Sequence, residues 1–274
     1  MPGPKSQAKT RPELPFHSAP TERIPDLRLP DHVALAYVPP PYHAPQPLPT
    51  PGAPSPPRGS VLLLDAILPE ALPLPELQRL VTGLRTALSL PVALRLGGPD
   101  PLKSLYLASN ARSVGCGAVL LECQPLAEGL RAFLAHPLDP ADEWLRWLQL
   151  RHPVPGQFRD TLQAVVRAAP VALNLPDLCC RIDTPMRTLA HRLRQARLPK
   201  LERWYDGSRV LHAELELQRD PALRVDQVAE RLGYADDLSF SNRAYRLFGV
   251  TPVTSRKLLG LEWRFREWWL RAYR

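Results

Sequence analysis

The sequence predicts an α/β module followed by an all-helical module, and three observations support that fold class. Between residues 61 and 135, short apolar runs alternate with longer amphipathic segments, which is typical of strands that alternate with helices. After residue 139, apolar residues recur only at helical spacing. Within that second half, two pairs of short helices are each separated by a tight turn. The predicted domains of the 274-residue chain are an arm at 1–58, an α/β domain at 59–136, a helical linker at 137–156 and an all-helical domain at 157–274.

The first 58 residues are expected to form an extended or disordered arm. They contain 17 of the 34 prolines, and proline neither donates a backbone hydrogen bond nor continues a helix. Residues 32–38 (HVALAYV) are the part of this arm with strand character. We expect a linker or a segment that lies on the next domain, and a docking ligand for a partner is the alternative.

The α/β domain is predicted from near-continuous apolar strands. Strands are expected at 61–69, 91–96 and 118–122, and helices at 75–88, 101–114 and 126–135. Buried strands in alternation with helices indicate a parallel sheet that is covered on both faces.

The all-helical half is expected to begin after a bridge between the domains. A helix at 141–150, with Trp144 and Trp147 one turn apart, is predicted to be that bridge. An amphipathic helix at 157–169 then opens the last domain.

The most informative stretch is 224–252, RVDQVAERLGYADDLSFSNRAYRLFGVTP. A first short helix is predicted from apolar residues at helical spacing, namely Val225, Val228, Ala229 and Leu232. Gly233 ends that helix, and after the turn Asp236 can cap a second one. The buried face of the second helix is predicted to hold Phe240, Ala244, Leu247 and Phe248, before Gly249 ends it. Two short helices joined by a tight glycine-containing turn indicate a helix-turn-helix.

A similar arrangement occurs upstream, at 175–196. A supporting helix is expected at 175–182, and Thr184 and Pro185 provide a cap and a first-turn proline for the next helix. The buried face of that helix is predicted to hold Met186, Leu189, Leu193 and Ala196. Residues 181–185 replace the glycine-containing turn and are expected to make it one residue longer.

The second motif resembles the DNA-binding domain of AraC-type transcription regulators, through the GY before its second helix and the LFGVTP after it. The resemblance implies two helix-turn-helices joined by a long helix, here expected at 200–219, and a sequence-specific regulator that binds double-stranded DNA. A helix of that length extends about 30 Å, close to the duplex repeat of about 34 Å. One chain is therefore expected to read two successive major-groove segments with helices near 185–196 and 237–248.

The predicted DNA-reading faces lie opposite the buried stripes of these two helices. They hold Arg187, His191, Arg194 and Gln195 in the first helix, and Leu238, Ser241, Asn242, Arg243 and Arg246 in the second. The base-contacting positions that the family resemblance implies are Arg187, Ala190, His191, Asp237, Leu238, Ser241 and Asn242. A single arginine is more often a solvated residue of a helix, but matched polar faces on two matched motifs favour contact with DNA.

The α/β domain resembles a response-regulator receiver, which has a flavodoxin-like fold, at the segment of Asp65, Leu68 and Pro69. The receiver's Ser/Thr and Lys-Pro positions are held here by Leu96, Gln124 and Pro125. A phosphoryl group on Asp65 would therefore lack the magnesium ion and the lysine that balance its charge. We expect a degenerate receiver-like module for protein contacts, and the alternatives are that Asp65 is a phosphoacceptor or an ordinary polar residue.

The positive charge lies in the second half of the chain. From residue 151 onward 22 Lys+Arg stand against 14 Asp+Glu, giving 22 − 14 = +8, and residues 1–150 hold 35 − 22 = 13 basic and 27 − 14 = 13 acidic residues. A basic domain beside a neutral one favours a polyanion as its partner, either nucleic acid or an anionic membrane. With no long apolar run and no signal-peptide pattern, we expect a soluble cytoplasmic protein without membrane association.

No cofactor, metal site or catalytic centre is expected. Cys116, Cys123, Cys179 and Cys180 have neither a zinc-binding nor a CxxC spacing, and no phosphate loop or HExxH occurs. Two alternatives stay open. One is an enzyme of DNA modification or repair with Cys116, Cys123 or Asp65 reactive, and the other is a DNA-associated adaptor with weak sequence preference.

Protein partners are also expected. The N-terminal domain is predicted to receive a signal or to contact RNA polymerase or a regulatory protein, and a homodimer is compatible with the sequence. Near the C-terminus, Trp263, Trp268 and Trp269 are expected to pack against the domain, and a dimer-facing or polymerase-facing surface is the alternative.

Overall fold

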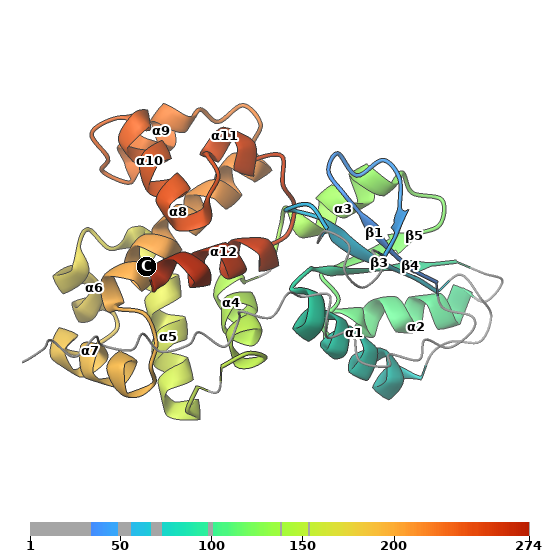
Figure 1. Cartoon of the computed structure of the whole chain (residues 1–274), viewed down its shortest axis with the longest axis horizontal. Helices are drawn as coiled ribbons and strands as arrows, with labels where there is room; N and C mark the ends of the chain where they lie inside the picture. The colour runs from blue at the N-terminus through green and yellow to red at the C-terminus, as the bar shows by residue number, and fades with distance from the viewer. Residues whose placement is uncertain are drawn as a thin grey trace, which may run out of the picture.

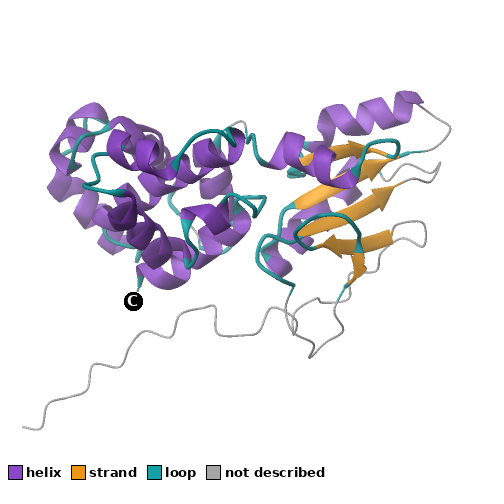
Figure 2. Ribbon diagram, turned by 90° about the horizontal axis from the view of Figure 1, so that it is seen from above, coloured by secondary structure: helices purple, strands orange, loops and turns teal. Residues whose placement is uncertain are grey.

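The computed structural model describes residues 34–48, 56–66, 73–97, 101–137, 139–152 and 154–273. These residues form an α/β half and an all-helical half that lie side by side (Figures 1 and 2). Most of the predicted arm, together with Leu68 and Pro69, lies outside the described residues.

The sheet of the described residues has five strands in the order β2-β1-β3-β4-β5. Its strands are β1 Ala34–Val38, β2 Gln46–Pro47, β3 Val61–Ala66, β4 Val92–Leu96 and β5 Ala118–Leu121. β3, β4 and β5 are parallel, with Leu64 beside Leu94 and Leu94 beside Val119. β1 runs antiparallel to both β2 and β3, so the predicted strand at 32–38 joins the sheet between β3 and the edge strand β2.

The prediction of a parallel sheet is therefore correct for three strands and wrong for the sheet as a whole, which is mixed. A parallel connection needs a crossover of about a dozen residues or more, and residues 39–45 between β1 and β2 are too few for one. The strand order is that of flavodoxin-like sheets. A receiver-like fold is nevertheless not confirmed, because β1 is antiparallel to β3. The last residue of β1, Val38, therefore lies beside Val61, at the other end of β3 from Asp65.

Helices cover both faces of the sheet, as predicted (Figure 1). Helices α1 Leu74–Leu88 and α2 Pro101–Ala111 lie on one face, because consecutive right-handed crossovers return to the same side. Helix α3 Leu126–Leu134 lies on the other face, where Leu63, Leu120 and Leu130 are buried together with Leu259 from the helical half.

The helical half has one continuous apolar core. Its elements are α4 Pro140–Gln149, α5 Gly156–Ala168, η2 Ala169–Val171, α6 Leu175–Arg181, α7 Met186–Gln195, α8 Leu201–Arg219, α9 Val225–Arg231, α10 Asp237–Phe248, α11 Pro252–Ser255 and α12 Glu262–Ala272. Trp144 of α4 lies at the centre of this core, with its ring centroid 5.3 Å from that of Trp204 and 4.8 Å from that of Trp268. The segment that was predicted to bridge the domains is thus packed inside the helical core.

The C-terminal tryptophans are also part of this core. Trp263, Trp268 and Trp269 are all buried, so their rings do not offer a surface for a second copy or for RNA polymerase. No helix within the described ranges combines the length and the apolar character needed to cross a membrane.

Candidate nucleic-acid interface

The two helix-turn-helix motifs have the same turn geometry. After α6 the Thr184 N–H donates to the Cys179 carbonyl (3.1 Å), and after α9 the Tyr234 N–H donates to the Ala229 carbonyl (2.9 Å). Each turn also contains one residue with a positive φ, which is Asp183 (48°) in the first motif and Gly233 (75°) in the second. The same backbone turn is therefore formed with an aspartate in one motif and a glycine in the other.

The lengths of the two turns differ in the direction opposite to the prediction. The first turn consists of 182–185 and the second of 232–236, so the first is one residue shorter, not longer. Pro185, at φ −58°, immediately precedes α7. Its ψ of 139° is extended, so Pro185 lies outside the first turn of α7, and Thr184 does not cap the helix, which has no side-chain cap hydrogen bond.

Helix α10 is fixed at both ends by the residues that the sequence indicates. The Asp236 carboxylate accepts a hydrogen bond from the Ser239 N–H (2.6 Å), and the Ser239 hydroxyl and N–H lower the pKa of Asp236. Gly249, with φ 73°, ends the helix, and its N–H donates to the Tyr245 carbonyl (2.8 Å). The charge of Asp236 is thereby used at the helix N-terminus, where the helix dipole favours it.

Both predicted reading faces are accessible. On α7, Leu189 and Leu193 are buried, whereas the side chains of Arg187, His191, Arg194 and Gln195 are exposed. On α10, Phe240, Ala244 and Leu247 are buried, whereas those of Leu238, Asn242 and Arg246 are exposed. Leu238 is 65% exposed, so the outer face of α10 also carries an accessible apolar side chain.

Two predicted residues of α10 are less available. Ser241 is half-buried. Arg243 is half-buried as well and forms an ion pair with Asp206 of α8. Burial lowers the pKa of Arg243, and the neighbouring charges of Arg203 and Arg246 lower it further. Arg243 is thus directed toward α8, and Tyr245 is a more exposed residue of the outer face, at 55%.

A cleft of about 450 Å³ lies beside α10 and is lined by charged residues of α8 and α10. Its cations are Arg209, Arg243 and Arg246, and Asp206 is its carboxylate. Arg209 lies over the Tyr205 ring, 5.0 Å from the centroid, and donates to the Leu232 carbonyl. Such a cluster of guanidinium groups suits the phosphate backbone of DNA. Arg209 is not predicted from the sequence, because the segment of α8 is expected there only to connect the two motifs.

Helix α8 separates the two motifs. In Figure 1, α9 and α10 lie at one end of it and α6 and α7 at the other, on the side of the molecule away from the sheet. The helix has 19 residues and is therefore about 28 Å long. Twelve of those residues are buried, so α8 is part of the core and cannot act as an exposed flexible linker.

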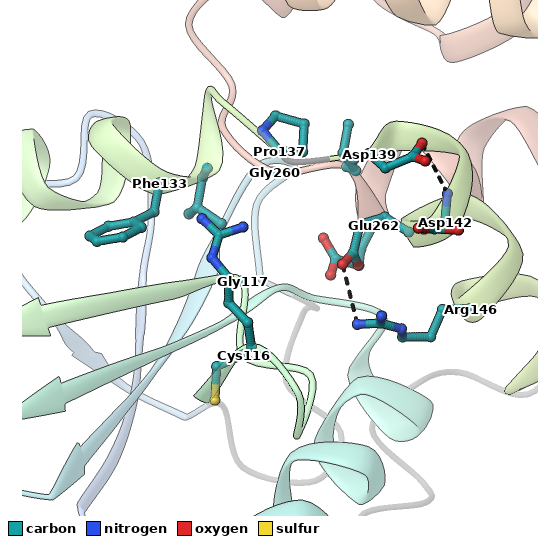
Figure 3. Close-up of a pocket in the computed structure, with 13 residues that line it drawn as sticks. Cys116, Gly117, Phe133, Pro137, Asp139, Asp142, Arg146, Gly260 and Glu262 are labelled. Carbon is teal, nitrogen blue, oxygen red and sulfur yellow. Dashed lines mark hydrogen bonds and ion pairs between the residues drawn. The ribbon is translucent and has the colours of Figure 1, made fainter. Parts of the chain in front are cut away.

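A cluster of buried charged groups joins the two halves. The Arg85 guanidinium of α1 is 3% exposed and lies 3.0 Å from Glu262 at the start of α12 and 3.1 Å from Glu143 of α4. Burial opposes the charge of Arg85, and the two carboxylates outweigh it and raise the pKa of Arg85. Glu143 and Glu262 also line a pocket of about 150 Å³ between the halves (Figure 3).

Contacts at Tyr42 and Arg58 also cross between the halves. The Tyr42 hydroxyl donates to the Gly59 carbonyl (2.9 Å) and accepts a hydrogen bond from the Leu259 N–H, and burial raises the pKa of Tyr42 to about 12. The Arg58 guanidinium donates to the Gly249 carbonyl at the end of α10 (3.1 Å) and lies 3.1 Å from Glu267 of α12. Arg58, which precedes β3, thus contacts the C-terminal end of α10 directly.

Asp65 and the cysteines are the residues that the sequence offered for chemistry. Asp65 forms an ion pair with Arg95 on the neighbouring strand, as an ordinary polar residue at a strand end does. All four cysteines are free, and burial raises the pKa of the Cys116 thiol to about 12, which makes it a poor nucleophile. The described residues contain no group of three or more side chains placed to hold a metal ion.

The geometry defines a protein with two helix-turn-helices on one continuous helical core. Residues 178–257 match a family model described as a helix-turn-helix domain, of the AraC type, which spans α7 through α11 and most of α6. The chain therefore carries an AraC-type DNA-binding domain of the kind found in transcription regulators. No curated protein and no solved structure matches the chain.

Proposed function

We propose that this protein is a sequence-specific transcription regulator that reads two successive major-groove segments of duplex DNA with α7 and α10. The observation that carries the proposal is the exposure of polar side chains on the outer faces of both helices, in two motifs of matching backbone geometry. A rigid connection of about 28 Å is compatible with one duplex repeat of about 34 Å.

The proposed contacts follow from the chemistry of each face. Arg187 is assigned to a guanine, Asn242 to an adenine and Leu238 to a thymine methyl. His191, Arg194, Gln195 and Ser241 extend these faces, and Arg246 borders the cleft beside α10. Arg209 and Arg246 are assigned to the phosphate backbone, which sets affinity without reading sequence, and Arg243 is assigned to positioning through Asp206.

The α/β half is proposed to control this activity by receiving a signal or a partner protein. Its contacts with the helical half through Arg58, Arg85 and Tyr42 give it a path to α10 and α12. RNA polymerase or a regulatory protein is the expected class of protein partner. Because Asp65 forms an ion pair with Arg95, we assign Asp65 a structural role and not a role in phosphoryl transfer.

Selection of bound sites from a random duplex pool tests the proposal. The expected result is a site of about twenty base pairs with two conserved blocks whose centres are about one helical turn apart. Binding that falls steeply with salt but enriches no sequence would instead identify a weakly specific adaptor. A permanent mass increase on Cys123 after incubation with alkylated DNA would identify a repair enzyme.

A further inference from the structure

A groove of about 860 Å³ opens at the carboxyl ends of β4 and β5, beside α2 and Phe133 of α3. Its apolar lining consists of Leu96, Leu105, Ala108, Val119, Leu121 and Phe133. The volume is within the range of about 300 to 1,000 Å³ of small-molecule sites. In α/β sheets, the crevice outside the carboxyl ends of the parallel strands is also where ligands bind.

Two apolar residues of the groove lining are exposed to solvent. Leu105 is 66% exposed and Leu121 is 46% exposed, and both border the groove. Leu121 belongs to β5, which is an edge of the sheet in the described chain. An apolar ligand in the groove would cover both side chains and remove their surface from water.

One cation borders the groove without a carboxylate partner among the described residues. Arg112 follows α2, is half-buried, and lies with its guanidinium 5.7 Å from the centroid of the Phe133 ring. A guanidinium bound in this way keeps its N–H donors for a planar carboxylate. Glu122 is the carboxylate of the groove, and it is an exposed residue beside Gly97.

We propose that this groove binds a small molecule with an apolar body and a carboxylate group. The carboxylate is bound by Arg112, and the apolar body lies against Leu105, Ala108 and Leu121. The class includes medium-chain fatty acids and aromatic acids, both of which combine an apolar body with a single carboxylate.

Arg112 and Phe133 also line the pocket between the two halves (Figure 3). That pocket contains Glu143 and Glu262, the carboxylates bridged by Arg85. A ligand carboxylate at Arg112 therefore changes the charge next to the contact between the halves. This last step rests on the proposed regulatory function, whereas binding itself does not.

Calorimetric titration of the full chain with octanoate, in the absence of DNA, tests the binding. Octanol and octylammonium are the matched neutral and cationic probes. Octanoate is expected to bind at least about tenfold more tightly than either, since a hydrogen bond to a charged group contributes about that factor. Equal binding of octanoate and octanol, or no binding of octanoate and of 1-naphthoate, overturns the proposal.

Three variants locate the site. Arg112→Gln is expected to remove the preference for octanoate over octanol, and Ala108→Trp to abolish binding of both by filling the groove. Arg79→Gln, at an exposed arginine of α1 outside the groove, is the matched control and is expected to bind like the unmodified chain. Circular dichroism checks the fold of each variant. Octanoate binding that survives Arg112→Gln unchanged rejects the site.

A second copy of the chain is the competing occupant of the same apolar face. Light scattering at several protein concentrations, with and without octanoate, separates the two. A monomer that binds octanoate supports the ligand site, and a dimer that Ala108→Trp dissolves but octanoate leaves intact contradicts it. Because neither measurement uses DNA, failure of the site remains distinguishable from failure of the regulator proposal.

Discussion

The turns of the two helix-turn-helices share a hydrogen bond and a residue of positive φ, but the motifs differ in turn length, surface and attachment. Counting from the first residue of each recognition helix, Arg187 and His191 of α7 correspond to Leu238 and Asn242 of α10. The outer face of α7 is therefore more cationic than that of α10. The second is attached to the α/β half through the hydrogen bond from Arg58 to the Gly249 carbonyl. In the part of the chain that the structure describes, no hydrogen bond or ion pair joins α7 to the α/β half.

From this difference we infer that the two helix-turn-helix motifs of the chain have different tasks. We expect the cationic helix α7 to supply affinity that depends little on the rest of the protein, and the more neutral helix α10, which contacts the N-terminal half, to respond to a signal. The following predictions are ordered by expected effect and each bears on that division.

The largest effect is expected from Arg264→Met. Arg264 of α12 and Glu214 of α8 are fully buried, 3.0 Å apart, and both contact Ser255 of α11. Removal of the guanidinium leaves a buried carboxylate unpaired, and we expect the free energy of unfolding in urea to fall by about 3 to 5 kcal/mol. Hydrogen exchange should rise more in α9–α11 than in α6–α7. The double variant Arg264→Met/Glu214→Leu should recover part of the loss, and an equal rise in both motifs would contradict the separate attachment.

Each substitution on a predicted reading face should weaken recognition of one of the two conserved blocks of the DNA site. We expect Arg187→Ala and Asn242→Ala each to cost about 1 to 3 kcal/mol of binding at the selected site and to relax preference at one base pair. Measured affinities for sites altered in the first or the second block check this. Arg192→Ala, an exposed arginine of α7 outside the predicted face, is the control and should weaken all sequences alike. If either reading-face variant behaves like this control, its assignment is wrong.

The turns should respond in opposite directions. Gly233 has φ 75°, so Gly233→Ala places a side chain in a left-handed conformation and should cost about 1 to 2 kcal/mol of stability. Asp183 already bears that strain at φ 48°, so Asp183→Gly should be neutral or stabilising by less than about 1 kcal/mol. Urea unfolding measures both. Destabilisation by Asp183→Gly would mean that its side chain has a role beyond the turn.

Acid should weaken α10 before α7. The pKa of Asp236 is lowered by Ser239, so its cap stabilises the fold at pH values above the unfolded-state pKa of about 3.9, and this stabilisation is lost as pH falls through the lower folded-state value. Helix α7 has no side-chain cap to lose. Asp236→Ala should lower Tm at pH 7, and the difference from the unmodified chain should shrink as the pH falls through the folded-state pKa of Asp236. A difference that persists unchanged in acid would assign the effect to something other than the charge.

The smallest effect is expected from Arg58→Gln. The ion pair with Glu267 is partly exposed, so its loss should reduce stability by less than about 1 kcal/mol. The informative result is local, because amide exchange should rise at the end of α10 and stay unchanged in α7. Arg79→Gln provides a control in the same half of the chain. Unchanged exchange at the end of α10 would mean that this contact does not couple the halves.

Much of the fold is predictable from the sequence because the helices are amphipathic and clearly ended. The prediction at 237–248 matches α10, and that at 157–169 differs from α5 by one residue at each end. The direction of β1 was not predictable, since apolar alternation marks a strand but not its orientation, which is set by pairing with β3. The end of α2 at Ala111, and not at 114, reflects the turn that contains Gly115 at φ 98°.

The candidate site was predicted only in part. Exposure of the reading faces follows from helical periodicity alone. The ion pair of Arg243 with Asp206, and the buried groups Arg85, Glu214 and Arg264, depend on contacts between residues far apart in the sequence. A single charged residue in an amphipathic helix resembles a surface residue until the neighbouring helix is known.

The burial of α4 has a practical consequence for dividing the protein. A fragment that begins near residue 157 would contain every residue of the matched helix-turn-helix region. It would lack Trp144, however, whose ring packs against Trp204 and Trp268. A DNA-binding fragment intended for fusion to another sensor domain, or for crystallisation alone, should therefore begin before Asp139. The carboxylate of Asp139 caps α4. Shorter versions are expected to aggregate through their uncovered aromatic centre.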